Sequence, residues 1–477
     1  MTSSILLFLP ELFYLMLSLL LFFASLSDHP NPRRTYLVLL VLSAVGIVLS
    51  ALSLNREGFL FFDAYRVDLF SQIFKLFLSV AYFLVITACS ELKGVRERYH
   101  SEFFLFLTTC TAGMMLMVSA VELMTIYISL ELSSFSLYIL VPMRKGKNFD
   151  VEAGVKYLFI GMTASCVMLF GMSYVFGVMH TTYLSEMAGK LPLVIREPGA
   201  MIGLLLLLSG FLFKLASVPF HFWAPDVYQG AANRVTTFIA TVSKIAAVAL
   251  LIRLTSLVGV PSKYLTDALT ILAVVSMSLG NLVAIVQKDL KRMLAYSAIS
   301  HAGYIMVGII NMTDLGYSSA VFYIAAYALM NFAAFMVVVQ LAAEGQDLRI
   351  ADLAGLSRRS PLLALTLMMA LFSLAGIPPT VGFTGKFLVF AAAVENDLLW
   401  LAIFGMVNAT ISLYYYLMVI KAAYIVEPEQ EEPLVQISGP IRLLNYTLIS
   451  AMIYLGVFPT QLYDIAHEAV RTLLMGR

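Results

Sequence analysis

Six basic side chains lie inside long apolar segments of this 477-residue sequence. They are Lys75, Lys156, Lys214, Lys244, Arg253 and Lys386. An ionisable side chain at the centre of a bilayer costs about 2.5–3.5 kcal/mol to insert, so it usually faces a polar interior and marks an ion or proton path. Lys75, Lys156 and Arg253 lie near the ends of their segments, so we expect them to extend to the membrane surface. The proton-transfer candidates are then Lys214, Lys244 and Lys386.

Three apolar segments also place hydroxyl groups on the same helical face as a titratable residue, at 100° per residue. The sets are Tyr127, Ser134 and Tyr138 with Glu131; Thr237 and Thr241 with Lys244; and Ser297, Ser300 and Tyr304 with His301. Such a face can line a hydrated path. Two alternatives stay open: the threonine hydroxyls can bond only their own backbone, and His301 can be a satisfied core residue rather than a proton relay.

The elements that carry these residues are membrane-spanning helices. Hydrophobic residues make up 61% of the chain and charged residues 12%, which excludes an ordinary soluble enzyme. Runs of roughly 20 apolar residues predict about fourteen spanning helices. Their approximate limits are 4–26, 35–54, 67–90, 102–120, 121–143, 154–179, 199–222, 234–257, 265–286, 291–310, 317–343, 361–394, 398–425 and 440–463.

The basic residues outside these runs predict the orientation. Lys and Arg are concentrated in the odd-numbered connections, including Arg144–Lys147, Lys288–Arg292 and the one with Arg234. Because cytoplasmic loops carry the excess of Lys and Arg, we expect both termini on the non-cytoplasmic side.

Two predicted helices are interrupted beside their lysines. Pro219 follows Lys214, and Gly376, Pro378 and Pro379 precede Lys386. Broken helices at membrane depth commonly border a cavity or ion site, the alternative being a packing kink. Lys214 and Lys386 are 172 residues apart, and Glu131 and His301 170. Each step advances five helices, which predicts an inverted repeat.

We therefore expect one integral membrane domain over 1–477. It would hold N-terminal helices in about 1–100, two five-helix repeats in about 102–257 and 265–425, and a final helix in about 440–463.

Several other functions are disfavoured by residue spacing. Cys89, Cys110 and Cys166 lie in apolar stretches without Cys-x-x-Cys spacing, so we expect buried small residues and no zinc or iron–sulfur site. No Gly-Lys pair has the spacing of a phosphate-binding loop. The net charge of +1 gives no indication of a nucleic-acid partner.

Three stretches carry a specific resemblance. FLFKLASVPFHFWAPDVYQGA (211–231), KDLKRMLAYSAISHAGY (288–304) and LSRRSPLLALTLMMALFSLAGIPPTVGFTGKF (356–387) resemble subunit N of proton-pumping NADH-quinone oxidoreductase, respiratory complex I. The likeness extends in hydropathy over nearly the whole chain and includes Pro10, Glu11 and Leu12. One departure is GAANRVTT at 230–237, where this family of antiporter-like subunits usually has a proline-containing GAPTPVT segment.

The resemblance implies fourteen helices with two inverted five-helix repeats, each containing a broken helix. It also implies that proton translocation uses a defined set of residues. These are Glu131, Lys214, Lys244, Lys386, His221 and His301. By the same resemblance, NADH, FMN, iron–sulfur clusters and quinone belong to other subunits, and this chain binds no cofactor.

The implied partners are the M-, K-, J- and L-type membrane subunits and, through them, the peripheral redox arm, in the inner membrane of a bacterium. Two other classes remain. A subunit of a multisubunit cation/proton antiporter would share the lysines and broken helices, and a structural membrane anchor would explain the loops but not the buried charges.

Overall fold

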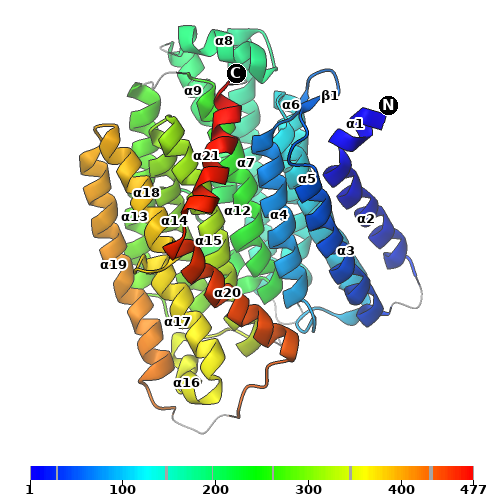
Figure 1. The fold of residues 1–477 in the computed structure, drawn as a ribbon, viewed down its shortest axis with the longest axis vertical. Coiled ribbons are helices and arrows are strands. Elements are labelled where there is room, and N and C mark those ends of the chain that lie inside the picture. The colour runs from blue at the N-terminus through cyan, green and yellow to red at the C-terminus, as the bar shows by residue number, and fades with distance from the viewer. Residues whose placement is uncertain are drawn as a thin grey trace.

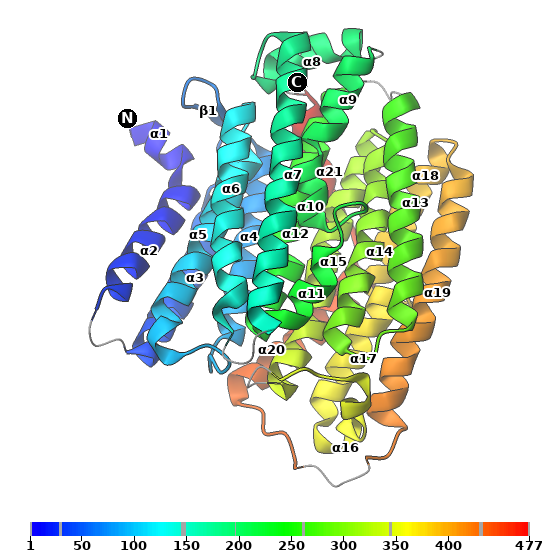
Figure 2. The ribbon, with the colours of Figure 1, turned by 180° about the vertical axis from the view of Figure 1, so that it is seen from behind.

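The computed structural model describes residues 2–27, 31–144, 149–195, 197–259, 263–342, 346–428 and 433–475. In these ranges the chain is nearly all helical, and the one sheet is an antiparallel hairpin of β1 (Gly58–Leu60) and β2 (Tyr65–Val67). The helices lie side by side in a single bundle (Figures 1 and 2). The expectation of an all-α, many-span membrane fold is confirmed, with twelve described helices long and apolar enough to cross a bilayer.

The first half of the chain forms the N-terminal helices and the first broken helix. The bounds are α1 (Thr2–Leu7), α2 (Leu9–Ser25), α3 (Pro32–Leu52), α4 (Leu69–Ala88), α5 (His100–Ser119), α6 (Leu123–Leu140), α7 (Phe149–Met179), α8 (Leu184–Val194), α9 (Pro198–Leu207), α10 (Ser209–Leu215), α11 (Trp223–Gly230) and α12 (Asn233–Ser256).

The second half contains the other broken helix and the C-terminal helices. The bounds are α13 (Lys263–Ile285), α14 (Leu290–Ile310), α15 (Asp314–Leu341), α16 (Leu356–Arg359), α17 (Pro361–Ala375), α18 (Val381–Glu395), α19 (Leu399–Tyr424), α20 (Gly439–Val457) and α21 (Thr460–Met475). The helices α1 and α21 lie at the same end of the bundle in both views, together with the β hairpin (Figures 1 and 2). Which side of the membrane this end faces stays a prediction.

The centre of the bundle is built from helices that are apolar all round. Every residue of α12 is buried, and α14 and α15 are nearly so, whereas α3, α19 and α20 expose most of their side chains. A helix that is hydrophobic on all faces is stable only when neighbours surround it. The three buried helices therefore form the core, and they carry Lys244, His301 and three tyrosines near these residues, Tyr304, Tyr323 and Tyr327.

Both broken helices end their first half with the same backbone cap. In α10 the N–H of Ser217 bonds the carbonyl of Leu212, and in α17 the N–H of Ile377 bonds that of Phe372. The preceding residues are left-handed, with φ of 60° at Ala216 and 89° at Gly376. This is the Schellman pattern that terminates helices.

The caps and the lysines of the two broken helices differ in spacing. Ala216 and Gly376 are 160 residues apart, whereas Lys214 and Lys386 are 172 apart. The two lysines therefore belong to different halves of their broken helices. The inverted relation between the repeats and the count of fourteen crossings stay predictions.

Each of the fourteen predicted segments contains a helix or two consecutive helices, but several other elements were not expected. The helices α8, α11 and α16 and the β hairpin lie between segments, and α21 begins at the end of the last one. Only Ala466, Ala469, Val470 and Leu473 are buried in α21, on the face that packs on α15 and α4. Its other face is polar, so a search for apolar runs does not detect it.

Candidate functional site

Lys214 lies in the last turn of α10, immediately before the break. Its side chain is 1% exposed, and its Nζ has no hydrogen-bond partner among the described residues. Glu131 of α6 interacts with it electrostatically. A cation near a helix C-terminus is favoured by the helix dipole, which accounts in part for the tolerance of a buried lysine here.

Lys386 lies in α18 and extends back across the second break. Its Nζ donates to the carbonyl oxygens of Leu374 at 2.9 Å and Ala375 at 3.0 Å, at the C-terminal end of α17. The last carbonyls of a helix have no partner within the helix, so the amine satisfies two of them. The Nζ also lies 4.7 Å from the centre of the Tyr304 ring. The break therefore creates the binding site for its own lysine.

Lys244 is fully buried in α12, the helix at the centre of the bundle. Its Nζ donates to the carbonyl of Ala298 in α14 at 3.2 Å and lies 5.3 Å from the centre of the Tyr327 ring. Ala298 is one turn before His301. The lysine and the histidine therefore occupy the same level of neighbouring helices.

His301 connects the two lysines through aromatic side chains. Its Nδ1 is hydrogen-bonded to Tyr323 Oη at 2.7 Å, and its Nε2 to Tyr416 Oη at 3.3 Å. The ring centre lies 5.4 Å from that of Tyr327 and 5.6 Å from that of Tyr304. These are the two rings that contact Lys244 and Lys386. Both lysines also interact electrostatically with the histidine.

The arrangement is a buried series in which the Tyr327 ring lies between Lys244 and His301 and the Tyr304 ring between His301 and Lys386. Two amines, an imidazole and phenol hydroxyls can each donate and accept protons when the right form is present. Both imidazole nitrogens have hydroxyl partners, so the ring can exchange protons with a hydroxyl group on each side. Among the described residues there is no group of three His, Cys, Asp or Glu that could hold a metal ion.

The hydroxyl faces noted in the sequence behave differently from one another. Thr237 and Thr241 donate to the backbone carbonyls of Asn233 at 2.8 Å and Thr237 at 2.6 Å, which is the alternative that the sequence left open. Ser297 is hydrogen-bonded to Tyr416 Oη at 2.5 Å. The partners of His301 itself come from α15 and α19 rather than from its own helix.

Glu131 and His221 lie apart from this series. Glu131 is half-buried, and its Oε1 accepts a hydrogen bond from Ser165 of α7. His221 is in the segment between α10 and α11, 5% exposed, with its ring 4.2 Å from that of Phe222. No hydrogen bond within the described chain joins Lys214, Glu131 or His221 to the series. The structure thus brings together three of the six predicted residues.

The expectation that Lys75 and Arg253 extend to the surface is wrong. Lys75 is fully buried with its Nζ 2.5 Å from Glu11 Oε1. Arg253 is 3% exposed and binds both carboxylate oxygens of Asp68, at 3.0 and 3.1 Å. In each case an acidic partner distant in sequence keeps the basic side chain inside the bundle. Lys156 fits the expectation better, with a side chain 42% exposed.

With the geometry described, the chain can be compared with known proteins. Residues 120–412 match the model of the family described as NADH:quinone oxidoreductase/Mrp antiporter, TM. The chain belongs to this family. The matched residues contain both broken helices and all six predicted site residues.

Named relatives and solved structures of this family align along almost the full length. NADH-quinone oxidoreductase subunit N 2 of Syntrophobacter fumaroxidans is 50% identical over 98% of this chain and 99% of its own. A chain of respiratory complex I from Thermus thermophilus is 31% identical, with a TM-score of 0.81 over 98% of this chain and 100% of that one. A chain of the Mrp complex from Dietzia has a TM-score of 0.87 over 99% and 98%, at 18% identity, which is a likeness of fold alone.

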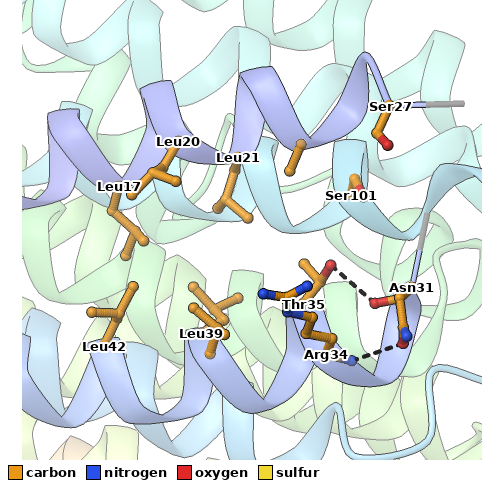
Figure 3. A pocket seen from close by; sticks show the side chains of 12 residues that line it. Leu17, Leu20, Leu21, Ser27, Asn31, Arg34, Thr35, Leu39, Leu42 and Ser101 are labelled. Carbon is orange, nitrogen blue, oxygen red and sulfur yellow. Dashed lines mark hydrogen bonds between the residues drawn. The ribbon is translucent and has the colours of Figure 1, made fainter. Parts of the chain in front are cut away.

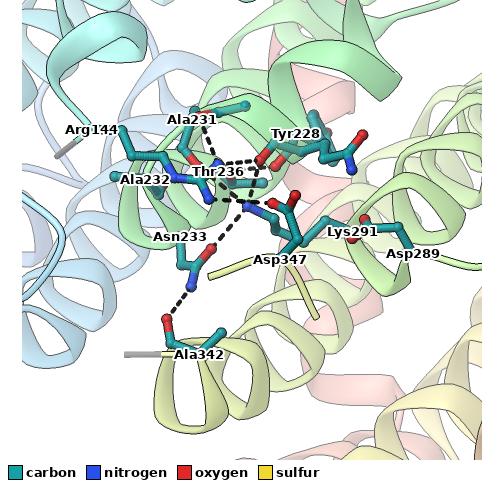
Figure 4. A network of polar contacts seen from close by, with 12 residues as sticks. Arg144, Tyr228, Ala231, Ala232, Asn233, Thr236, Asp289, Lys291, Ala342 and Asp347 are labelled. Atoms are coloured by element: carbon teal, nitrogen blue, oxygen red, sulfur yellow. Dashed lines mark hydrogen bonds and ion pairs between the residues drawn. The ribbon is translucent and has the colours of Figure 1, made fainter. Parts of the chain in front are cut away.

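The loop at 230–237, whose sequence departs from that of the family, is bound by three basic side chains. Lys291 Nζ donates to the carbonyl of Gln229 at 2.7 Å and to Asn233 Oδ1 at 3.0 Å, and Arg144 Nη1 donates to the same carbonyl at 2.8 Å (Figure 4). Arg234 Nε donates to the carbonyl of Ala88 at 3.1 Å. The prediction of the orientation counted all three as basic residues of the loops. Lys291 and Arg234 are buried instead, and they stabilise the end of α11 and the start of α12. Lys145 and Lys147 lie outside the described residues.

Sequence reasoning missed the tyrosines that complete the site. Tyr323 and Tyr327 are one turn apart in an apolar helix, and Tyr416 lies in a run of three tyrosines. The pair at i and i+4 was a usable signal, because a shared face is required for both to reach one histidine. The expectation for the cysteines also needs one correction: Cys89 and Cys110 are buried, but Cys166 is exposed.

Proposed function

We propose that this chain is a proton-translocating subunit of the membrane arm of an NADH-quinone oxidoreductase. The observation that carries the proposal is the buried series Lys244, His301 and Lys386, in which a tyrosine ring lies between the histidine and each lysine. Membership of the family and full-length relatives named subunit N support it. Electron transfer in other subunits would drive proton movement through this one.

The energetics require that the buried charges act as a gate. Moving one elementary charge against 100 mV costs about 2.3 kcal/mol, so an open path would leak protons. Lys386 is held by α17 carbonyls that favour its charged form. A change in the break that withdraws these carbonyls would favour release of the proton toward His301. We assign Glu131 and Lys214 to a second charged pair, which responds to proton movement in the Lys244–His301–Lys386 series. His221 lies at the break that follows Lys214.

The redox chemistry is assigned to other subunits. We propose that NADH, FMN, iron–sulfur clusters and quinone bind elsewhere in the complex and that this chain has no catalytic redox centre. Its partners would be the M-, K-, J- and L-type membrane subunits, with the peripheral arm attached through them. The location would be a bacterial inner membrane, with both termini on the non-cytoplasmic side.

A multisubunit cation/proton antiporter is the second candidate, because the family model covers both classes and the Mrp chain has the same fold. Identity separates them, at 50% to the subunit N relative and 18% to the Mrp chain. The decisive experiment is to purify the chain with its native partners from membranes. We expect flavin and iron–sulfur subunits and NADH-dependent quinone reduction. Recovery with antiporter subunits alone, and with cation-driven proton exchange, would overturn the proposal.

A further inference from the structure

The N-terminal helices contain a second column of buried polar side chains that the central series does not use. In α4 and its N-cap, the polar residues recur every three or four positions and so fall on one helical face. They are Asp68, Gln72, Lys75, Ser79 and Tyr82, of which the first is 3% exposed and the others are fully buried. Fourteen residues of helix span about 21 Å, a large part of the roughly 30 Å hydrocarbon core.

The neighbouring helices place polar residues opposite this face. Ser50 of α3 is hydrogen-bonded to Ser79 at 2.8 Å, and Thr108 of α5 to Tyr82 at 2.6 Å. Tyr14 of α2 is fully buried beside Ser79. The helices α3 and α5 pack directly on α4, and α2 packs on both of them.

The centre of the column is an ion pair between Glu11 and Lys75. Both side chains are fully buried, and Tyr65 of β2 donates a hydrogen bond to the same carboxylate oxygen that the lysine contacts. Replacing a buried ion pair by apolar residues of similar volume is often neutral or stabilising, so stability alone is a weak reason to hold two charges here.

Several polar atoms around this pair lack partners among the described residues. They are Glu11 Oε2 and the Oε1 and Nε2 atoms of Gln72, all buried. A buried polar atom without a hydrogen bond costs about 1–3 kcal/mol, and such sites are commonly satisfied by ordered water. A cluster of them around a carboxylate and an amine is therefore a site for hydration.

The two ends of the column are directed toward different ends of the bundle. Asp68 lies beside the β hairpin, where it binds Arg66 at 3.3 Å, a side chain 19% exposed. At the other end, Ser101 lies two turns from Thr108 on the same face of α5. Ser101 lines an open groove of about 360 Å³ between α2 and α3, near Asn31 and Arg34 (Figure 3).

We propose that α2 to α5 enclose a second proton-conducting column, centred on Glu11 and Lys75 and separate from the Lys244–Lys386 series. In the central step the ammonium of Lys75 gives its proton to the carboxylate of Glu11, which leaves a neutral amine and a neutral acid. The amine then takes a proton from water on one side, and the acid releases one to water on the other. The inference rests on the proposed proton-translocating function.

The test is proton pumping per electron pair by the assembled complex in proteoliposomes. The double variant Glu11→Leu/Lys75→Met removes both titratable groups without leaving one buried charge. We expect assembly and quinone reduction to persist and pumping per electron pair to fall. The matched control is Glu186→Leu/Lys190→Met, the same change at an exposed pair in α8, which should pump normally. Normal pumping by the first variant would show that the pair is only structural.

Two further measurements keep the outcomes distinct. Lys214→Met reports on the proposed function itself: if it too pumps normally, that function fails, whereas a normal result for the Glu11/Lys75 variant alone refutes only the column. If the double variant does not assemble, infrared difference spectra of the working complex decide. We expect a carboxylic acid band that Glu11→Gln abolishes and Glu131→Gln preserves, and a spectrum without such a band would overturn the proposal.

Discussion

The hydroxyl of Tyr323 should be required for proton transfer through His301, and the hydroxyl of Tyr327 should not. Both tyrosines are fully buried in α15, one turn apart, and both rings contact the imidazole. Of these two tyrosines, only Tyr323 is hydrogen-bonded to the imidazole, at 2.7 Å from Oη to Nδ1. The Oη of Tyr327 has no partner among the described residues. Each Tyr→Phe change removes one oxygen atom and keeps the ring, so the pair forms a matched comparison.

The magnitude follows from the bond that is lost. When His301 is protonated its Nδ1–H donates to Tyr323 Oη, and a hydrogen bond to a charged group is worth about 1.5–3 kcal/mol. The neutral ring also bonds Tyr323 and loses about 0.5–1.5 kcal/mol, so the protonated form loses about 1–1.5 kcal/mol more. Since about 1.4 kcal/mol is a factor of ten, Tyr323→Phe should make the protonated histidine roughly 5- to 13-fold rarer. Tyr416 bonds Nε2 at the longer distance of 3.3 Å, so Tyr416→Phe should have a smaller effect.

The assay is proton pumping alongside quinone reduction by the purified complex in proteoliposomes. We expect pumping to fall by up to the factor above in Tyr323→Phe, with assembly unchanged, and to stay near normal in Tyr327→Phe. Equal losses in the two variants would mean that ring packing and not the hydroxyl matters. No loss in Tyr323→Phe would remove His301 from the path.

Three other results are expected. Arg253→Met leaves the buried carboxylate of Asp68 without its main partner, so the stability of the assembled complex to denaturant should fall by about 3–5 kcal/mol, whereas a loss below 1 kcal/mol would contradict the burial of the pair. Burial tends to raise the pKa of Asp68, but Arg253 and Arg66 outweigh it and hold the pKa below its usual range. The stabilisation by ionised Asp68 is therefore complete above about pH 4 and is lost as the pH falls further. An acid-unfolding series should show this loss, and a loss that begins near neutral pH would contradict it. Gly280→Ala places a Cβ 2.6 Å from the backbone nitrogen of Ser300, so it should separate α13 from α14 and lower the stability by about 1–3 kcal/mol in thermal unfolding. The control Gly177→Ala, whose Cβ has no atom within 4 Å, should lose no stability, and equal losses in the two variants would contradict the close packing at Gly280.

The spanning helices could be predicted from the sequence because the bilayer imposes their length and apolar character. Breaks beside Lys214 and Lys386 were visible for the same reason, since Pro and Gly interrupt an otherwise regular pattern. The helix α21 has no such pattern in hydropathy, because its buried face is narrow and its other face is polar.

The partners of buried charges could not be predicted, because they come from distant parts of the chain. Lys75 and Arg253 were expected to reach the surface by their place in a helix, yet Glu11 and Asp68 hold them inside the bundle. Local spacing also could not show that Lys386 turns back to the carbonyls of α17. That contact depends on how the break folds, and it brings Lys386 within reach of the Tyr304 ring.

The central claim is that the buried lysines carry protons, and one measurement on Lys244 tests it most directly. Lys244→Met keeps most of the side-chain volume and removes the amine that lies between Ala298 and Tyr327. In proteoliposomes we expect the assembled variant to keep its quinone-reductase subunits but to lose proton pumping, while Lys190→Met, at a side chain 47% exposed, pumps normally. Full pumping per electron pair by the Lys244→Met complex would contradict the account.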